Sequence, residues 1–238
     1  MIQYERQQNI LNILRHRGTA SVRELSAAVF ASEASVRRDI EALEKQGYVK
    51  RIYGGVRISR HENSVIPLDL RDPEHSAVKD QLARRAAEMI PDGATVLLDA
   101  SSTTRRILRY LEQRRDLKII TNNIRLLHEA GNPAIQLYGT GGAYNPSNHA
   151  FVGPAAEAYV RGISADLFFF SSQGITEEGE ITDVSEEETS LRRVMLSRAK
   201  RSIFLCDSSK IGIRRVFTLC TRHDVDRIIC DTMLPWEQ

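Results

Sequence analysis

The stretch Ser32 to Val56, SEASVRRDIEALEKQGYVKRIYGGV, joins a short amphipathic helix to a basic hairpin that closes on two glycines. Val36, Ile40 and Leu43 recur at helical spacing, which predicts that they share one buried face. The paired arginines Arg37-Arg38 then lie on the opposite face, exposed to solvent. An exposed arginine pair beside a basic hairpin indicates a surface that contacts the bases and phosphates of double-stranded DNA.

Two further short helices are predicted upstream of this stretch. Ser21 to Glu24 has the spacing of a capping box and opens one of them, and an apolar stripe from Ile10 to Leu14 marks the other. Three helices followed by a hairpin resemble the winged helix-turn-helix of the DeoR (GlpR-type) bacterial repressors. The matching motifs are Arg37-Arg38-Asp39 and Tyr53-Gly54-Gly55.

Nine residues are expected at the DNA. Those on the third helix would enter the major groove, where arginine can read guanine, and the basic hairpin residues would neutralise flanking phosphates. The aromatic and glycine residues would shape the hairpin so that its backbone approaches the DNA. The set is Ser35, Arg37 and Arg38 on the helix, with Lys50, Arg51, Tyr53, Gly54, Gly55 and Arg57 on the hairpin. A merely solvated charged face is the alternative for the two arginines.

The charge of the chain is divided unevenly along its 238 residues. The first 60 residues carry 11 basic and 6 acidic side chains, a net charge of +5, so the remainder carries −3. A basic N-terminal part joined to a mildly acidic remainder fits a DNA-binding end joined to a domain that does not bind DNA.

The apolar runs are too short to span a bilayer and the polar N-terminus lacks a signal-peptide core, which predicts a cytoplasmic protein with no membrane partner.

The sequence divides into three parts: a winged helix-turn-helix over residues 1–58, a linker over 59–74 and an effector-sensing and oligomerisation domain over 75–238. The linker contains two prolines and no sustained period. Beyond it, short apolar strands alternate with helices, which predicts an α/β domain with a mostly parallel sheet. The predicted strands are 95–98, 118–120, 135–138, 166–170, 202–206 and 227–230, and the predicted helices include 103–111, 124–130, 155–161 and 187–199.

Small polar residues follow five of these strands. Ligands of parallel sheets bind beyond the strands' carboxyl ends, and the hydroxyls and amides at a helix start can hold an anion such as phosphate. The residues after the first strand, Asp99 to Thr104, could equally well be a surplus of N-capping residues. The candidate effector residues are Asp99, Ser101, Ser102, Thr103, Thr104, Asn122, Gly141, Gly142, Gln173 and Lys210.

These strand ends also resemble the DeoR effector domain, which is related to ribose-5-phosphate isomerases and CoA transferases and binds phosphorylated sugars or similar metabolites. The resemblance covers nearly the whole chain. Two departures stand out: Ala100-Ser101-Ser102-Thr103 replaces the family's more usual Ser-Gly-Thr-Thr, and Arg192 stands where a lysine is more common. Both could change which ligand fits.

A sugar-phosphate isomerase with an accessory DNA-binding domain is the main alternative. Related isomerases carry an acidic pair in the loop that here reads Ser171 to Ile175, and that pair is missing. The acids just downstream, between Glu177 and Asp183, are expected to be solvent-exposed, so we expect no enzyme. The second alternative is a DNA-binding protein whose second domain only oligomerises.

The remaining residues predict no metal site and no cofactor. The three cysteines are widely spaced in apolar contexts, the six histidines lack ligand spacing, and no nucleotide-binding glycine signature is present. The sequence therefore predicts a transcription regulator, most simply a repressor of a carbohydrate-metabolism operon. Its partners would be operator DNA, a phosphorylated sugar or similar effector, and further copies of itself in a homodimer or larger even oligomer.

Overall fold

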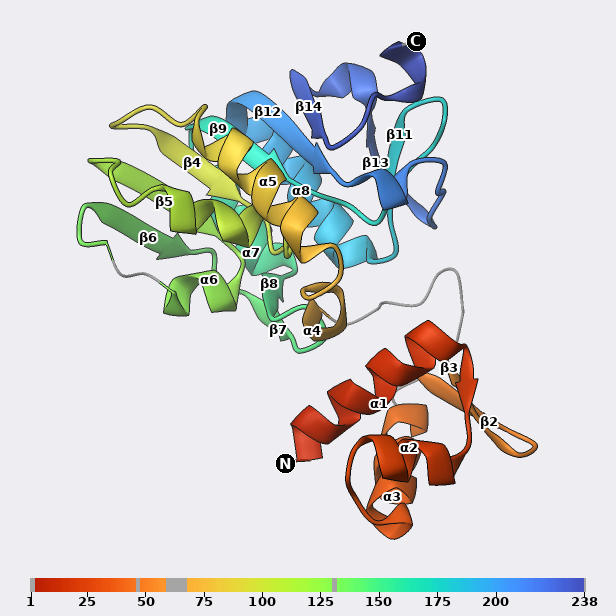
Figure 1. The fold of residues 1–238 in the computed structure, drawn as a ribbon. Helices are drawn as coiled ribbons and strands as arrows, with labels where there is room; N and C mark the ends of the chain where they lie inside the picture. The colour runs from red at the N-terminus through yellow and green to blue at the C-terminus, as the bar shows by residue number, and fades with distance from the viewer. Residues whose placement is uncertain (1–2, 46–47, 59–67, 130–131, 238) are drawn as a thin grey trace. The chain divides into compact units, whose positions relative to one another are not determined.

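The computed structural model describes residues 3–45, 48–58, 68–129 and 132–237 (Figure 1). The chain forms two compact units, Met1–Leu70 and Arg71–Gln238, so the division falls four residues before the expected end of the linker. Most of that linker lies outside the described residues. Its last part contains a short helix that the sequence analysis did not predict, α4 (Leu68–Arg71). Asp72 follows it and forms ion pairs with Arg105 and Arg106 of the second unit.

The N-terminal unit has the three helices and the hairpin that the sequence predicts, with one additional short strand. The antiparallel sheet has the strand order β1-β3-β2. Ser21 and Glu24 form the capping box at the start of the second helix. The elements are α1 (Gln3–Arg17), β1 (Thr19–Ala20), α2 (Val22–Ala28), α3 (Glu33–Lys45), β2 (Val49–Ile52) and β3 (Gly55–Ile58).

Apolar side chains from all three helices meet under the hairpin. Val36, Ile40 and Leu43 of α3 are buried there, as their spacing predicts. Asp39 of the same helix is also fully buried, where its Oδ2 accepts a hydrogen bond of 2.5 Å from Arg6 Nε of α1. The aspartate of the Arg-Arg-Asp motif therefore joins α3 to α1 and does not face solvent.

The second unit contains a six-stranded sheet with the order β14-β12-β9-β4-β5-β6, in which every adjacent pair is parallel. This confirms the predicted α/β fold. Predicted and observed bounds agree fully for β4 and β14, whose apolar residues are flanked by polar turns. The strands are β4 (Thr95–Leu98), β5 (Leu117–Thr121), β6 (Ile135–Gly139), β9 (Ala165–Phe170), β12 (Ala199–Cys206) and β14 (Arg227–Cys230).

Helices cover both faces of this sheet. Figure 1 shows α5 passing in front of the strands and α8 behind them. Side chains alternate along each strand, so Phe169 joins the core under α5 whereas Phe168 and Phe170 join the core under α7 and α8. The elements are α5 (Ser76–Ala87), η1 (Thr104–Tyr110), α6 (Ile124–His128), α7 (Pro154–Arg161) and α8 (Glu186–Arg198).

Two smaller antiparallel groups of strands were not predicted from the sequence. One is the pair β7 and β8, and the other is a three-stranded sheet with the order β10-β11-β13. Short 3-10 turns complete the unit. In the described part of the chain, no helix is both long and apolar enough to cross a membrane. The elements are β7 (Ala143–Asn145), β8 (Ala150–Val152), β10 (Gly174–Ile175), β11 (Glu180–Asp183), η2 (Ser208–Lys210), β13 (Phe217–Thr221), η3 (Arg222–Asp224) and η4 (Pro235–Glu237).

The substitution Asp39→Asn should loosen the contact between α1 and α3. It removes the negative charge opposite the largely buried Arg6, at a cost of about 2–4 kcal/mol in the free energy of local opening. Hydrogen-exchange mass spectrometry on the full chain would measure this opening in peptides from both helices. Glu41→Gln is the matched control, because the Glu41–Lys45 pair on the same helix is exposed and should contribute less than about 1 kcal/mol. Equal effects of the two substitutions would contradict a structural role for Asp39.

Candidate functional site

The predicted effector residues follow strands of one parallel sheet and therefore lie along its carboxyl edge. Five of them belong to one network of hydrogen bonds and ion pairs, which runs through Ser171, Asp183, Asp207 and Arg192. The other five lie along the same edge, but among the described residues no side-chain bond joins them to that network. The first group is Asp99, Ser101, Thr104, Gln173 and Lys210, and the second is Ser102, Thr103, Asn122, Gly141 and Gly142.

Arg192 of α8 lies at the centre of this network. Its three guanidinium nitrogens contact three carboxylates: Asp99 at 2.8 Å, Asp183 at 2.9 Å and Glu188 at 3.0 Å. All four side chains are at most 5% exposed. Burial alone would lower the pKa of Arg192, but the three carboxylates outweigh it and raise the pKa. Burial raises the pKa of Glu188, and Arg192 opposes that shift.

Asn148 extends the network away from the sheet edge. Its Nδ2 donates to Glu188 Oε1 at 2.5 Å, and its Oδ1 accepts from Arg71 Nη2 at 2.6 Å. Arg71 is the first residue of the second unit. A chain of polar contacts therefore leads from Asp99 at the end of β4 to the start of this unit.

The hydroxyl-rich turn after β4 separates into two pairs of side chains. Ser101 Oγ accepts from Thr104 N at 3.1 Å and lies 2.8 Å from Thr104 Oγ1, which also donates to Asp99 Oδ1. These two hydroxyls hold the turn together. The hydroxyls of Ser102 and Thr103 make no hydrogen bond to the residues that the structure describes. They are the two that a ligand could engage.

The helix after this turn differs from the predicted one. A helix was predicted over 103–111, and the structure contains a 3-10 helix of seven residues, Thr104–Tyr110. So short a helix has little dipole to offer an anion, because a helix dipole sums over aligned peptide units. Anion binding at this turn would therefore depend on the hydroxyl and backbone donors themselves.

Asn122, Gly141 and Gly142 lie after β5 and β6. Asn122 Nδ2 donates to Phe151 O at 3.0 Å, whereas its Oδ1 is buried without a hydrogen-bond partner in the described part of the chain. A Cβ on Gly142 would lie 2.6 Å from Val152 O, so this glycine is required for the packing of the loop against β8. The unpartnered amide oxygen of Asn122 is the feature here that favours a ligand.

Lysine side chains supply positive charge on the other side of the network. Lys210 Nζ donates to Ser171 Oγ at 2.8 Å and lies 3.1 Å from Asp207 Oδ2. Lys79 of α5 is buried and donates to the backbone carbonyl of Arg71. Burial, followed by the charge of Lys210, lowers the pKa of Lys79 to about 8. Burial opposes ionisation of Asp207, but Lys210 and a bond from Ser209 outweigh it and lower its pKa.

The predicted DNA-binding residues lie on α3 and the hairpin. Arg37 and Arg38 are both exposed; Arg37 pairs with Glu33 at 2.9 Å, and Arg38 makes only a 3.5 Å contact with Ser35 Oγ. A surface hollow of about 460 Å³ separates α3 from the hairpin and is lined in part by Arg37 and Arg51. Arg51 also pairs with Glu44 at 3.2 Å.

The hairpin places two cations opposite one another. Lys50 on β2 is in register with Arg57 on β3, and both are exposed without an ion pair to any described carboxylate. Like charges in this position repel, so an anion such as a DNA phosphate would stabilise them. Tyr53 is fully exposed at the tip beside Gly54, whose φ is +82°. Gly55 has a different role, because a Cβ there would lie 2.6 Å from Ala20 O.

Comparison with known proteins gives two family matches. Residues 6–62 match a DeoR-like helix-turn-helix domain, and residues 74–232 match the DeoR C terminal sensor domain. The chain belongs to the DeoR family. It is therefore a DNA-binding transcriptional regulator with a C-terminal sensor domain, and the resemblance read from the Arg37-Arg38-Asp39 motif is confirmed.

Relatives of this DeoR-family chain match over almost its full length. A putative aga operon transcriptional repressor from Escherichia coli O157:H7 is 31% identical over 97% of this chain and 87% of its own length. An L-fucose operon activator from Escherichia coli K12 is 30% identical over 95% of this chain and 94% of its own. Among solved structures, ribose 5-phosphate isomerase A from Methanocaldococcus jannaschii is 16% identical over 58% of this chain and 55% of that one, with a TM-score of 0.44.

Several residues of the network in this DeoR-family chain were not expected from the sequence. Asp183 was expected to be solvent-exposed and is buried against Arg192, so that expectation was wrong. Lys79, Asn148 and Glu188 were not singled out at all. The four-residue spacing from Glu188 to Arg192 was a usable signal for an ion pair on one helix face. Nothing in the sequence brings Asn148 or Lys79 to the same edge.

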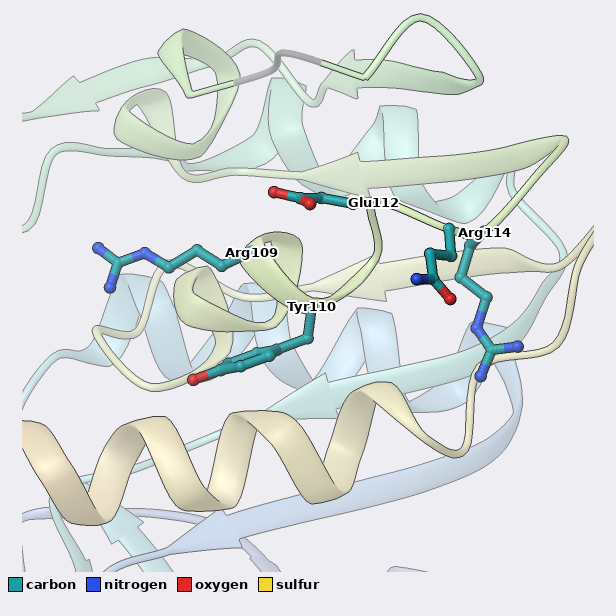
Figure 2. Close-up of a pocket in the computed structure, with 5 residues that line it drawn as sticks. Arg109, Tyr110, Glu112 and Arg114 are labelled. Atoms are coloured by element: carbon teal, nitrogen blue, oxygen red, sulfur yellow. The ribbon is translucent and has the colours of Figure 1, made fainter.

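A surface hollow elsewhere on the unit does not coincide with these residues. Its volume is about 380 Å³, and it is lined by residues at the end of η1 and in the segment before β5: Arg109, Tyr110, Glu112, Gln113 and Arg114. Asn122 follows the opposite end of that strand. Figure 2 shows the side chains of Glu112 and Arg114 directed away from each other, so they do not converge on a ligand. No group of three or more potential metal ligands is found among the described residues.

The substitution Lys79→Met should change how stability depends on pH. The pKa of this lysine is lowered from 10.5 to about 8 in the folded chain, so the folded chain releases the proton at a lower pH than the unfolded chain. Raising the pH from 8 to 10.5 should therefore stabilise the wild-type chain relative to the variant.

Thermal unfolding of both proteins across this range would measure the difference. Lys200→Met is the control, because bonding to Asp166 raises the pKa of that exposed lysine and the same gain is not expected. A wild-type chain that shows no gain over Lys79→Met would contradict the lowered pKa.

Proposed function

We propose that the chain represses a carbohydrate-metabolism operon and that a phosphorylated sugar or related metabolite, bound at the carboxyl edge of the six-stranded sheet, controls its affinity for operator DNA. The observation that carries the effector part is the combination of unengaged donors and acceptors at this edge. They are the hydroxyls of Ser102 and Thr103 and the amide oxygen of Asn122, and they lie beside the positive charges of Lys79 and Lys210, which have internal partners.

The charges at this edge favour a ligand with an anionic end and a hydroxyl-bearing end. Arg192 cannot serve a phosphate, because all three of its nitrogens already contact carboxylates. A phosphate would instead bind the ammonium groups of Lys79 and Lys210 and the free hydroxyls of the turn. The amides of Asn122 and Gln173 are suited to sugar hydroxyls, since an amide can both donate and accept.

The name of one relative agrees with a sugar-linked regulator. One is named for the L-fucose operon and is an activator, and the other is named a putative repressor of the aga operon. Repression is our proposal for this chain. The oligomer is proposed on physical grounds: one small helix-turn-helix contacts few base pairs, and a symmetric dimer or larger even assembly would engage paired half-sites.

Catalysis is not part of the proposal. The loop after β9 reads Ser171-Ser172-Gln173-Gly174 and has no carboxylate that could act as a base. The nearest buried acids, Asp99 and Asp183, both form ion pairs with Arg192 and are engaged by it. Turnover of a pentose or hexose phosphate by the purified protein would overturn this part.

Titration of the protein onto DNA from upstream of its own operon, at fixed salt and with a panel of sugar phosphates, tests the proposal. We expect specific binding that at least one sugar phosphate changes. Arg38→Ala should weaken specific binding by about 1–3 kcal/mol if this arginine reads a base. Lys45→Ala, which removes one charge from the end of the same helix, should change it by less.

Two results would count against the proposal, and a third would count against base reading by Arg38. Specific binding that no sugar phosphate alters would refute the effector part. If the effector tightens binding to the operator and raises transcription, the chain is an activator and not a repressor. A reporter assay on the same DNA would detect this. Equal loss from both substitutions would mean that Arg38 contributes only charge.

The double substitution Ser102→Ala with Thr103→Ala should abolish effector binding without unfolding the turn. Neither hydroxyl bonds to the described residues, so the unliganded melting temperature should stay close to that of the wild type. A sugar phosphate should raise the melting temperature of the wild type by an amount set by the ratio of its concentration to Kd. This increase should be lost in the double variant.

Ser101→Ala provides the contrast. Its hydroxyl caps Thr104 N, so its loss should lower unliganded stability by about 1 kcal/mol. A double variant that keeps the full ligand-induced shift would exclude the two hydroxyls from the site.

A further inference from the structure

Two of the three cysteines lie directly opposite each other in the six-stranded sheet. Cys206 ends β12 and Cys230 ends β14, and they are register partners on these adjacent parallel strands. Both side chains face the core under α7 and α8, where Cys206 is fully buried and Cys230 is 8% exposed. Adjacent strands lie about 4.8 Å apart, which is within the Cα separation that a disulfide accepts.

We propose that Cys206 and Cys230 form a reversible disulfide when the protein meets a peroxide, and that this disulfide reports oxidation to the effector site. All three cysteines are free in the structure. The third, Cys220, lies on β13 in a different sheet and has no cysteine opposite it.

Cys230 is the thiol that reacts first. It is the more exposed of the two, and a hydrogen bond from Cys206 lowers its pKa. The same contact, with burial, raises the pKa of Cys206. By contrast, burial raises the pKa of Cys220 to about 12. The thiolate is the reactive form, so this order of pKa values makes Cys230 the nucleophile.

The reaction is balanced by one peroxide for each pair of thiols. The Cys230 thiolate attacks one peroxide oxygen, the O–O bond breaks, and hydroxide leaves with a proton as water, so that Cys230 becomes a sulfenic acid. Cys206 then loses its proton and attacks the sulfenic sulfur. The S–S bond forms, the S–O bond breaks, and a second water leaves. Two thiols are oxidised by two electrons and one peroxide is reduced.

The position of the pair connects it to the turn that carries Lys210. Asp207 follows Cys206 and pairs with Lys210 at 3.1 Å. Asp231 follows Cys230, and its carboxylate accepts from Ser208 N at 2.6 Å and from Ser208 Oγ at 2.9 Å. In the reduced protein, Cys206 Sγ lies 3.4 Å from Asp207 O and Cys230 Sγ lies 3.6 Å from Asp231 Oδ1.

Forming the disulfide removes both thiol hydrogens, so neither sulfur can donate to these oxygens, and the contacts that hold the Lys210 turn change. The disulfide itself does not depend on the function proposed above. Its effect on the ligand does, because that effect requires Lys210 to bind the effector's phosphate.

The test uses the full-length Cys220→Ala chain, which keeps only the proposed pair. After hydrogen peroxide treatment under native conditions, we expect both thiols to be lost, the mass to fall by two hydrogens, and proteolytic peptides to show Cys206 linked to Cys230. Dithiothreitol should restore both thiols. The matched control is Cys220→Ala with Cys230→Ala, whose single thiol cannot form this bond within one chain. In the linked protein, the apparent affinity for inorganic phosphate, measured by thermal stabilisation, should fall roughly tenfold.

Each outcome decides one part of the proposal. Thiols that stay free, or links between chains in place of the pair, overturn the disulfide. An intramolecular disulfide with unchanged phosphate affinity overturns its link to the effector site. A reduced chain that does not respond to phosphate counts against the proposed function, and the thiol measurement then still decides the disulfide by itself.

Discussion

The second unit depends on one buried guanidinium. Arg192 joins Asp99, which follows β4 and is 93 residues away in the sequence, to Asp183 at the end of β11 and Glu188 on its own helix. Burying three carboxylates around one cation is costly, and only bonds to every charged group make it tolerable. Asn148 supplies one of these bonds to Glu188. Because Arg192 contacts all three, the small β10-β11-β13 sheet, the helix α8 and the edge of the large sheet are fixed relative to one another.

The N-terminal unit uses its charged motif differently. Within Arg37-Arg38-Asp39, the aspartate is buried and pairs with Arg6, whereas both arginines are exposed. The buried pair orients α3 on α1, and the exposed pair is left to contact a ligand. Three adjacent charged residues therefore have two roles, one in packing and one at the surface. This is possible because consecutive helix positions point in directions about 100° apart. The same division occurs in the hairpin, where Gly55 packs on Ala20 and the cations point outward.

Local pattern was enough to predict the elements that are stabilised by burial along their own length. The strands β4 and β14 have the expected bounds, and the helices α7 and α8 begin one residue before theirs. The pairing of β11 with β13 was missed because it depends on residues far apart in the sequence, such as Thr182 with Thr218. The burial of Asp183 was missed for a similar reason. It depends on the contact with Arg192 in the folded chain, and an acidic loop sequence does not reveal that contact. The strand exits were predictable because parallel topology brings them together whatever their detailed contacts.

The hydrogen bonds of the lysines indicate how a ligand could alter this arrangement. Lys79 and Lys210 already have internal partners, the carbonyl of Arg71 and the side chains of Ser171 and Asp207. A phosphate that binds these ammonium groups must replace or share those bonds. Arg71 is the first residue of the second unit, so releasing its carbonyl changes what holds the start of that unit. A ligand shifts an equilibrium only through a difference in affinity between two states. The exchange of the Lys79–Arg71 bond for a bond to phosphate is one contact in which such a difference could arise.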